Sequence, residues 1–412
     1  MSNHNDPRGE FADGSLRIFT AYEGSTPLLS VVPHRSPLPD PMRQTNPNVP
    51  VRLSRFAYLR RVGTTMRLET PRSAVYAEIL DPRVGALVAG LSFDLTPREL
   101  AVRTGLALDS TCACIGLLES MGAVAPADRP GSLNANPSLG GVIDEDVEIP
   151  QTWEFHDLLF HSRVRAGRQR QKLGRSTRFG DIGGGAYEES TEPLPGDVVL
   201  PRVDIANAVA SDRPFGEVLR SRSTDRDWSG PDLQLSQVSE LLARVCESFP
   251  RKHGLLGDQG DGFGRTYPSG GSVYETDLVI VPTRVTGLPF SAYLYRPHSH
   301  SLSPLRGSDE SAIKLLYNAS EATGGGVSTP QALVVCAARF PDLAIKYEGI
   351  AYSLMLKHVG ILMATVAYTA SAMGLGCAVL GTGNSDDFAA ATGLDYYRHG
   401  SVGEMTLSVP PA

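Results

Sequence analysis

One apolar stretch constrains the fold of this chain more than any other feature. No residue from Val359 to Gly381 carries a charge, and a run of this length could form a membrane-spanning helix. Small residues dilute it, however, and Gly374 and Gly376 interrupt the helical pattern near its end. We therefore predict a buried helix followed by a strand. A membrane span is the alternative, because small residues and glycines also occur in membrane helices.

Length and charge limit the class of protein. The chain has 412 residues, of which 41% are hydrophobic and 20% charged, and this predicts two or more globular domains. A formal net charge of -7 does not support general nucleic-acid binding, which needs a basic surface. The polar N-terminus lacks an apolar signal core. We therefore expect a cytoplasmic protein, with neither a nucleic acid nor a membrane as its partner.

Metal-ligating residues give only weak signals. No C-x-x-C pair occurs, so we expect buried free thiols rather than disulfides or structural zinc. His298 and His300 lie in a turn rich in Pro and Ser and have no visible third ligand, which favours an exposed turn and no metal site. The five cysteines are Cys112, Cys114, Cys246, Cys336 and Cys377.

The N-terminal part of the chain has a winged-helix-like pattern. Strand-like runs precede a helix after Asp81, and Thr96 with Glu99 forms a capping-box signature at the start of the next helix. The last helix of the set, 108–121, contains no Arg or Lys to meet DNA phosphates, so a peptide-binding or structural role is favoured. The predicted segments are a disordered tail at 1–14, this domain at 15–126, a linker at 127–150, a helical lead-in with a basic arm at 151–205, and the main α+β domain at 206–412.

The basic arm allows two interpretations. Seven Arg or Lys residues and no acidic residue occur between Arg163 and Arg178. Such a segment could attract an acidic peptide or a phosphate, or it could be a solvated arm.

Two segments carry groups suited to binding phosphate. Clustered guanidinium and hydroxyl groups occur at Arg222, Ser223, Thr224 and Arg226. The glycine turn at 381–384 follows a predicted strand and could present successive amides to a phosphate. Taken alone, the first segment could equally be surface arginines near a helix end, and the second lacks the G-x-G-x-x-G spacing of a dinucleotide site.

Two further segments suggest a planar ligand and proton transfer. Tyr267, Pro268 and Ser269 lead into paired glycines, which allow a backbone to approach a planar ligand closely; a tight loop is the alternative. Lys346 and Tyr347 are predicted to lie at a junction between a strand and a helix. They could act in proton transfer if burial lowers the Lys pKa, or Lys346 could simply be exposed at a helix start.

Considered together and in this order, these motifs resemble the nitroreductase superfamily, and specifically the SagB-like azoline dehydrogenases of the streptolysin S type. The resemblance covers the last 200 residues or so. It implies an α+β domain with a central mixed or antiparallel sheet flanked by helices, and FMN bound at a homodimer interface. Its most specific elements are the Arg-Ser-Thr-x-Arg segment, the Tyr-Pro-Ser-Gly-Gly loop, Tyr293-Leu294-Tyr295 followed by Leu302, and the Lys-Tyr pair.

The resemblance also implies a role for each motif. In the family, Lys346 and Tyr347 match the catalytic pair, and one of them takes a proton while the flavin takes a hydride from a thiazoline or oxazoline ring. The FMN contacts implied are Arg222, Ser223 or Thr224, and Arg226 for ribityl and phosphate oxygens, Pro268, Ser269 and Gly270 for the isoalloxazine ring, and Gly381 and Gly383 for the later phosphate-side loop.

The implied partners are an azoline-containing precursor peptide and the cyclodehydratase that forms its rings. The N-terminal module resembles the winged-helix peptide-binding elements of ribosomal-peptide maturation, which suggests leader binding. One departure concerns Arg222, because the family commonly has two adjacent arginines before the Ser, whereas Ser221 precedes Arg222 here. The alternatives are a general NAD(P)H-dependent nitro- or quinone-reductase and a non-catalytic scaffold subunit of an azole synthetase complex.

Overall fold

The computed structural model divides the chain into two compact units, Met1–Leu173 and Gly174–Ala412, each described here by itself. The predicted linker 127–150 lies outside the described residues apart from Ala127, and so do residues 169–172 and 177–178 of the basic arm. The residues that the structure describes are 8–11, 17–34, 44–127, 152–168, 173–176, 190–246, 248–250, 263–324 and 328–411.

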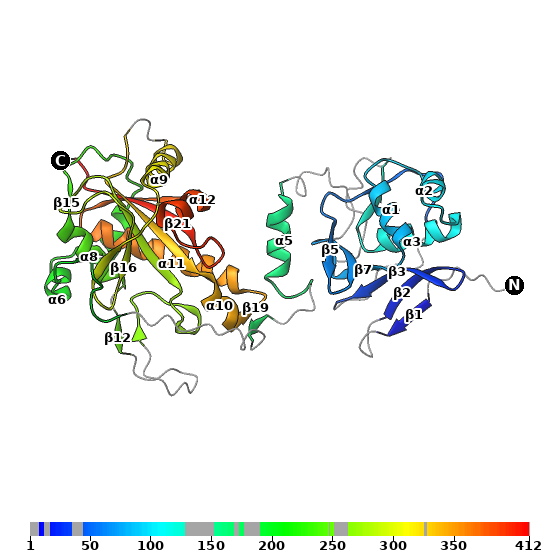
Figure 1. Cartoon of the computed structure of the whole chain (residues 1–412), viewed down its shortest axis with the longest axis horizontal. Helices are drawn as coiled ribbons and strands as arrows, with labels where there is room; N and C mark the ends of the chain where they lie inside the picture. Colours follow the sequence, from blue (N-terminus) through cyan, green and yellow to red (C-terminus); the bar gives the residue numbers. More distant parts are fainter. Residues whose placement is uncertain are drawn as a thin grey trace. The chain divides into compact units, whose positions relative to one another are not determined.

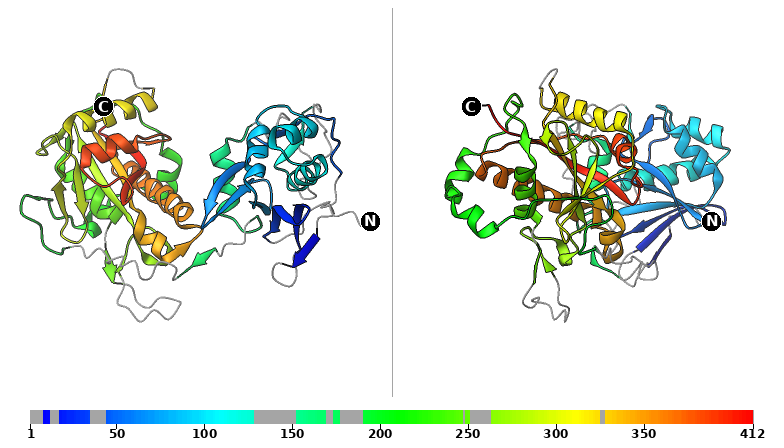
Figure 2. Two further views of the ribbon diagram at one scale, coloured as in Figure 1. Left: turned by 45° about the vertical axis from the view of Figure 1, so that its right-hand side comes forward. Right: turned by 60° about the vertical axis from the view of Figure 1, so that its left-hand side comes forward.

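The first unit contains a six-stranded antiparallel sheet in the order β1-β2-β3-β7-β6-β5. Its dark-blue strands, which come first in the sequence, can be followed in Figure 2. Gly24 and Gly63 have φ values of 58° and 61° and form the tight turns of two hairpins in this sheet. Arg8–Phe11 was predicted within a disordered tail and instead forms β1, because its backbone pairs with β2. The strands are β1 (Arg8–Phe11), β2 (Arg17–Glu23), β3 (Thr26–Pro33), β5 (Tyr58–Val62), β6 (Thr65–Glu69) and β7 (Val75–Ile79).

Three helices between residues 82 and 120 and a small second sheet also belong to this unit. The two predicted helix starts are confirmed, since Asp81 caps one helix and Thr96 and Glu99 form a capping box at the next. The sheet is larger than the winged-helix pattern implied, because β1–β3 extend it. The elements are α1 (Pro82–Gly90), α2 (Pro97–Thr104), α3 (Leu108–Ser120), β4 (Val51–Leu53) and β8 (Val124–Pro126).

Helix α5 (Phe155–Arg163) belongs to the first unit and corrects two expectations. It was predicted to lead into the C-terminal domain, but Phe155 packs against Tyr58 and Arg163 donates to Tyr58 and to the buried Glu69. Burial would raise the pKa of Glu69, but hydrogen bonds from Arg60 and Tyr58 and the charge of Arg163 lower it. Arg163 is therefore a structural ion-pair partner rather than part of a solvated arm.

The second unit contains the predicted antiparallel sheet, with seven strands in the order β10-β17-β16-β14-β18-β21-β20 (Figure 1). The strand predicted to precede the glycine turn at 381–384 is confirmed as Gly376–Leu380. The strands are β10 (Val198–Val199), β14 (Thr276–Pro282), β16 (Tyr293–Arg296), β17 (Ser301–Pro304), β18 (Ala332–Arg339), β20 (Gly376–Leu380) and β21 (His399–Ser408).

Both faces of this sheet are covered by helices, as Figure 1 shows. Alternate residues of β14 explain why: Leu278 and Ile280 share a core with α8 (Leu235–Cys246) and α11 (Ala351–Ala372). Val279 and Val281 point to the other face, where α9 (Asp309–Ala322) and α12 (Ser385–Thr392) pack. The shorter elements are β9 (Gly174–Arg175), α6 (Ile205–Ala210), α7 (Phe215–Ser221), β11 (Leu233–Gln234), β12 (Phe249–Pro250), β13 (Phe263–Gly264), β15 (Val285–Thr286), α10 (Phe340–Lys346) and β19 (Tyr347–Glu348).

Helix α11 accounts for the long uncharged stretch, and the predicted order of a buried helix followed by a strand is confirmed. One side of α11 is buried in the core, and β20 follows it after the left-handed Gly374. By length and composition alone α11 could also cross a membrane, as core helices of soluble proteins often could. The predicted free thiols are confirmed as well, with four of the five cysteines buried.

Candidate functional site

The loop after Tyr267 has an unusual backbone. Gly271, Ser272 and Tyr274 all have positive φ values, of 62°, 55° and 49°. For residues with a side chain this conformation costs on the order of 1 kcal/mol or more, and it persists only where surrounding contacts enforce it. Ser269 supplies two of these contacts, because its hydroxyl accepts from the Tyr274 amide at 3.0 Å and donates to Glu275 at 3.2 Å.

A buried histidine holds the same loop and was not predicted from the sequence. The amide of Gly270 donates to Nε2 of His358 at 2.8 Å, and Nδ1 of His358 lies 2.7 Å from Oε1 of Glu275. His358 is 6% exposed and Glu275 is fully buried. His358 lies inside the long apolar helix, where a single histidine gives no sequence signal that separates a core residue from a functional one.

The predicted catalytic pair lies against this loop. Nζ of Lys346 donates to the carbonyl of Gly271 at 2.8 Å. A Cβ atom on Gly271 would lie 2.8 Å from the Tyr347 hydroxyl and 2.9 Å from Lys346 Nζ. The structure therefore brings together Lys346, Tyr347 and the Ser269–Gly271 segment, while their chemical roles stay predictions. Lys346 ends the short helix α10, which intervenes where a direct junction between strand and helix was expected.

Gly271 gives a direct test of this packing. We expect Gly271→Ala to lower turnover at least about tenfold, because the new methyl group displaces Lys346 and Tyr347 from their positions. Gly374→Ala is the matched control, since Gly374 has a similar φ of 73° but nothing within 4 Å of the added Cβ. Turnover and thermal unfolding of both variants check this; equal losses of turnover would assign the effect to backbone strain alone.

Gly381 and Gly383 line a second part of the site, a cavity of about 290 Å³. Val359 and Met363 of α11 line it too, so residues adjacent in α11 reach both this cavity and the Gly270 loop. A Cβ on Gly383 would lie 2.6 Å from Oε1 of Glu404. A side chain at 383 would therefore displace the carboxyl group of the buried Glu404.

Glu404 is a buried acid at this cavity, and it too was not predicted. It is 1% exposed and accepts a hydrogen bond from the Ser401 hydroxyl at 3.2 Å. Burial raises the pKa of Glu404 to about 7, and the hydrogen bonds from Ser401 and the Asn384 backbone only partly oppose that rise. The cavity therefore contains a group that gains or loses a proton near neutral pH.

The Arg222–Arg226 segment follows α7 and contacts the start of β20. The amide of Asp225 donates to the carbonyl of Cys377 at 3.3 Å, whereas Gly381 follows the far end of this strand. The four residue steps from Cys377 to Gly381 separate the two places by roughly 13 Å, at about 3.3 Å per residue. The structure thus places the predicted arginine segment and the glycine turn at opposite ends of β20, and only an extended ligand could touch both.

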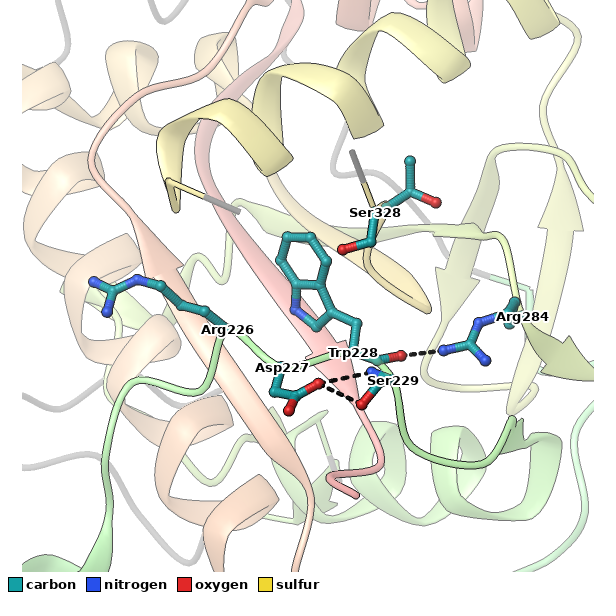
Figure 3. A pocket seen from close by; sticks show the side chains of 7 residues that line it. Arg226, Asp227, Trp228, Ser229, Arg284 and Ser328 are labelled. Carbon is teal, nitrogen blue, oxygen red and sulfur yellow. Dashed lines mark hydrogen bonds between the residues drawn. The ribbon is translucent and has the colours of Figure 1, made fainter. Parts of the chain in front are cut away.

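Arg226 lines a pocket of about 690 Å³ (Figure 3). In the figure the side chains of Arg226 and Arg284 lie on opposite sides of Trp228. Arg284 donates to the carbonyls of Trp228 and Gly230. The guanidinium groups of Arg222 and Arg226, in contrast, make no hydrogen bond or ion pair with any residue of the described ranges, so both are available to an anion. Ser223 and Thr224 are exposed beside them.

A cluster of charged residues, of which Asp277 is buried and Arg339 and Asp342 are partly buried, holds the end of the loop. Arg339 donates to the carbonyl of Tyr274 at 2.9 Å and to Asp342 at 2.7 Å, and it also binds Asp277. Burial would raise the pKa of Asp277, but His399 and Arg339 beside it lower it. Arg339 therefore connects β14, β18 and α10, the elements that carry the loop and Lys346.

The turn containing His300 differs from the expected exposed turn. His300 bonds to Ser239 at 2.8 Å and to the Tyr295 hydroxyl at 2.9 Å. Burial lowers its pKa, which favours the neutral imidazole. His300 is thus part of a partly buried structural network, and the described part of the chain contains no group of three metal-ligating residues.

Two family models match the chain. Residues 51–170 match the model described as cyanobactin oxidase ThcOx, and residues 219–407 match the model of the nitroreductase family. No curated protein is similar enough to match.

Several solved structures are similar to part of the chain. A putative nitroreductase from Ralstonia eutropha JMP134 is 21% identical, with a TM-score of 0.39, over 58% of this chain and 96% of its own. The E. coli microcin synthetase McbBCD complex with truncated pro-MccB17 bound is 17% identical, with a TM-score of 0.36, and the match covers 57% of this chain and 87% of the other. A putative nitroreductase from Anabaena variabilis ATCC 29413 is 16% identical, with a TM-score of 0.37, and the match covers 61% of this chain and 45% of the other.

Proposed function

We propose that this chain, which belongs to the nitroreductase superfamily and joins a nitroreductase-family domain to a cyanobactin-oxidase domain, is an FMN-dependent azoline dehydrogenase. It would oxidise thiazoline or oxazoline rings of a modified peptide to thiazoles or oxazoles. The observation that carries the proposal is the contact of Lys346 and Tyr347 with the Ser269–Gly271 loop. A reductase that receives hydride from NAD(P)H needs no such pair, because it removes no proton from a carbon of its substrate.

The residues present fit FMN. The guanidinium groups of Arg222 and Arg226 make no hydrogen bond or ion pair with other described residues. Together with the exposed hydroxyls of Ser223 and Thr224, they supply the donors that a phosphate and a ribityl chain require. The Pro268–Gly270 segment would face the ring system, and the Gly381–Gly383 turn would face another part of the cofactor. When bound, the flavin accepts the hydride that leaves the azoline ring.

The chain itself must supply the base. Aromatising an azoline removes one proton and one hydride, so a basic atom must lie beside the carbon that loses the proton. The Lys346 amine is held at the Gly271 carbonyl, and the Tyr347 hydroxyl lies at the same glycine. Either group could take the proton, with the other orienting it, and the two single substitutions described in the Discussion separate these roles.

The exposed side of α11 supports a homodimer. Tyr352 and Leu356 are 48% and 37% exposed and lie one helical turn apart, and Gly360 is exposed one further turn along the same face. An apolar stripe of this kind on a long helix is covered favourably by a second copy of itself, as two-fold interfaces are. We propose that α11 forms the centre of that interface.

The partners proposed are an azoline-containing precursor peptide and the cyclodehydratase that makes its rings. The match of residues 51–170 to a cyanobactin oxidase model supports a peptide substrate rather than a small quinone or nitro compound. We propose that the first unit binds part of that peptide and that the protein acts in the cytoplasm.

The test is to purify the protein, record its absorbance spectrum, identify any released chromophore, and incubate it with an azoline-containing peptide. We expect a yellow protein that contains FMN and removes two hydrogen atoms from each azoline ring, as mass spectrometry would show. Rapid bleaching of the flavin by NAD(P)H, with no ring oxidation, would instead identify a nitro- or quinone-reductase. A colourless protein that still binds the peptide would identify a scaffold subunit.

A further inference from the structure

The Glu275–His358 pair lies behind the proposed catalytic loop and has no role in the proton and hydride transfers considered above. We propose that His358 is a positioning residue: by accepting a hydrogen bond from the Gly270 amide, it fixes the loop whose Gly271 carbonyl in turn holds Lys346. This inference rests on the proposed function for its catalytic consequence. The hydrogen bond from the Gly270 amide to a neutral imidazole does not depend on which substrate the protein has.

The hydrogen-bond chemistry determines the protonation state of His358. A backbone N–H can only donate, so Nε2, which lies 2.8 Å from the Gly270 nitrogen, must be an unprotonated acceptor. The ring proton is then on Nδ1, which donates to the Glu275 carboxylate at 2.7 Å. A protonated imidazolium would place two donors against each other at Gly270. Glu275 therefore acts by selecting the tautomer and fixing the ring orientation.

The loop needs this support because its backbone is strained. The positive φ values at Ser272 and Tyr274 are unfavourable for residues with side chains. Contacts at both ends oppose relaxation: His358 holds Gly270 at one end, and Arg339 holds the Tyr274 carbonyl at the other. Glu275 joins the two, because its carboxylate binds His358 and its backbone carbonyl accepts from the amide of Arg339 at 2.8 Å.

The loop transmits this constraint to the proposed base. The Lys346 amine donates to the carbonyl of Gly271, one residue after the amide that His358 holds. If the Gly270 bond is lost, the Gly271 carbonyl is free to move, and Lys346 loses its fixed position. A displacement of about 1 Å at a reacting group can lower the rate about a hundredfold.

Two amide substitutions separate the two bonds of His358. The side-chain oxygen of Gln reaches the place of Nε2, so His358→Gln retains an acceptor for Gly270 that cannot be protonated. The shorter Asn reaches only the place of Nδ1, so His358→Asn retains a partner for Glu275 and loses the bond to Gly270. Lys357→Gln, at the adjacent exposed position of the same helix, is the control for a substitution in α11 that leaves both bonds intact.

Three measurements on the full-length protein test the inference. Nitrogen NMR of the histidine rings should show His358 as the neutral tautomer protonated at Nδ1. Hydrogen exchange of the Gly270 amide should accelerate at least about tenfold in His358→Asn and stay near the wild-type rate in His358→Gln and Lys357→Gln. Turnover of an azoline peptide should fall between about tenfold and a hundredfold in His358→Asn, mainly in kcat, and recover to within about threefold in His358→Gln.

The outcomes distinguish this inference from the proposed function. Unchanged Gly270 exchange in His358→Asn, or a protonated imidazolium at position 358, would overturn the inference even if azolines are oxidised. Equal losses of turnover in the Asn and Gln variants would also overturn it, because the acceptor would then not matter. If no variant oxidises azolines but exchange and NMR behave as expected, the proposed function fails and the positioning contact stands.

Discussion

Replacing Lys346 by Met and Tyr347 by Phe together is expected to lower azoline oxidation by about 10²- to 10⁴-fold, the usual contribution of a positioned general base. Lys346 would lose its amine and Tyr347 only its hydroxyl, so the apolar contacts of both side chains are largely retained. The measurement is single-turnover oxidation of an azoline peptide followed by mass spectrometry, with flavin content determined in parallel. Unchanged flavin content would locate the loss in the chemical step.

The single variants assign the roles. Replacing only the residue that acts as the base should lower the rate nearly as much as replacing both residues does. The reason is that the effects of groups that act as a unit are not additive. A matched control is Lys314→Met with Tyr317→Phe on α9, a Lys and a Tyr that are exposed on the opposite face of the sheet. Full product formation by the Lys346 and Tyr347 double variant would contradict the proposal and favour a scaffold subunit.

Much of the second unit could be predicted because local patterns and tertiary structure agree. The uncharged stretch became α11 and β20 because the paired glycines end the helix in a left-handed turn at Gly374. The runs that became β14 and β18 are apolar on both faces, as central strands must be when helices cover both sides. The matched family model covers the same region.

The residues that could not be predicted from the sequence are those whose importance depends on contacts with residues far away in the chain. His358 lies in a helix and Glu275 at the start of a strand, and 83 positions separate them. Glu404 lies in β21 and matters because Gly383 packs directly against it. Likewise, the assignment of Arg163 to a basic arm overlooked Glu69, a buried acid on a strand that needs a countercharge. No spacing rule reveals such pairs.

Glu404→Gln is expected to stabilise the protein increasingly as pH rises from 5 to 8. Burial raises the pKa of Glu404 from 4.5 to about 7, so the folded protein binds this proton more tightly than the unfolded chain does. The stabilising contribution of the protonated acid is fully present below pH 4.5 and is lost as pH rises to about 7. The wild-type protein therefore carries a penalty of about 3 kcal/mol at pH 8, since each pKa unit corresponds to about 1.4 kcal/mol.

The Gln side chain removes this penalty because it is nearly the same size and does not ionise. Its oxygen can still accept from Ser401 or the Asn384 amide, the two donors that meet the carboxyl group. Denaturant unfolding at pH 5 and pH 8 should show a stability difference between variant and wild type that is larger at pH 8 by about 2.5 kcal/mol, because a small part of the penalty is already present at pH 5. Glu310→Gln, at an exposed ion pair on α9, is the control and should show little pH dependence of this kind.

The same substitution bears on the cavity that contains Gly381 and Gly383. If Glu404 is protonated when the protein works near neutral pH, Glu404→Gln should leave flavin binding intact at pH 6 and pH 8. If the ionised carboxylate instead shapes the glycine turn, the variant should bind flavin as the wild type does at pH 6 and differently at pH 8. A stability difference that stays constant from pH 5 to pH 8 would contradict the raised pKa, and with it the view that this buried acid titrates beside the cavity that Gly381 and Gly383 line.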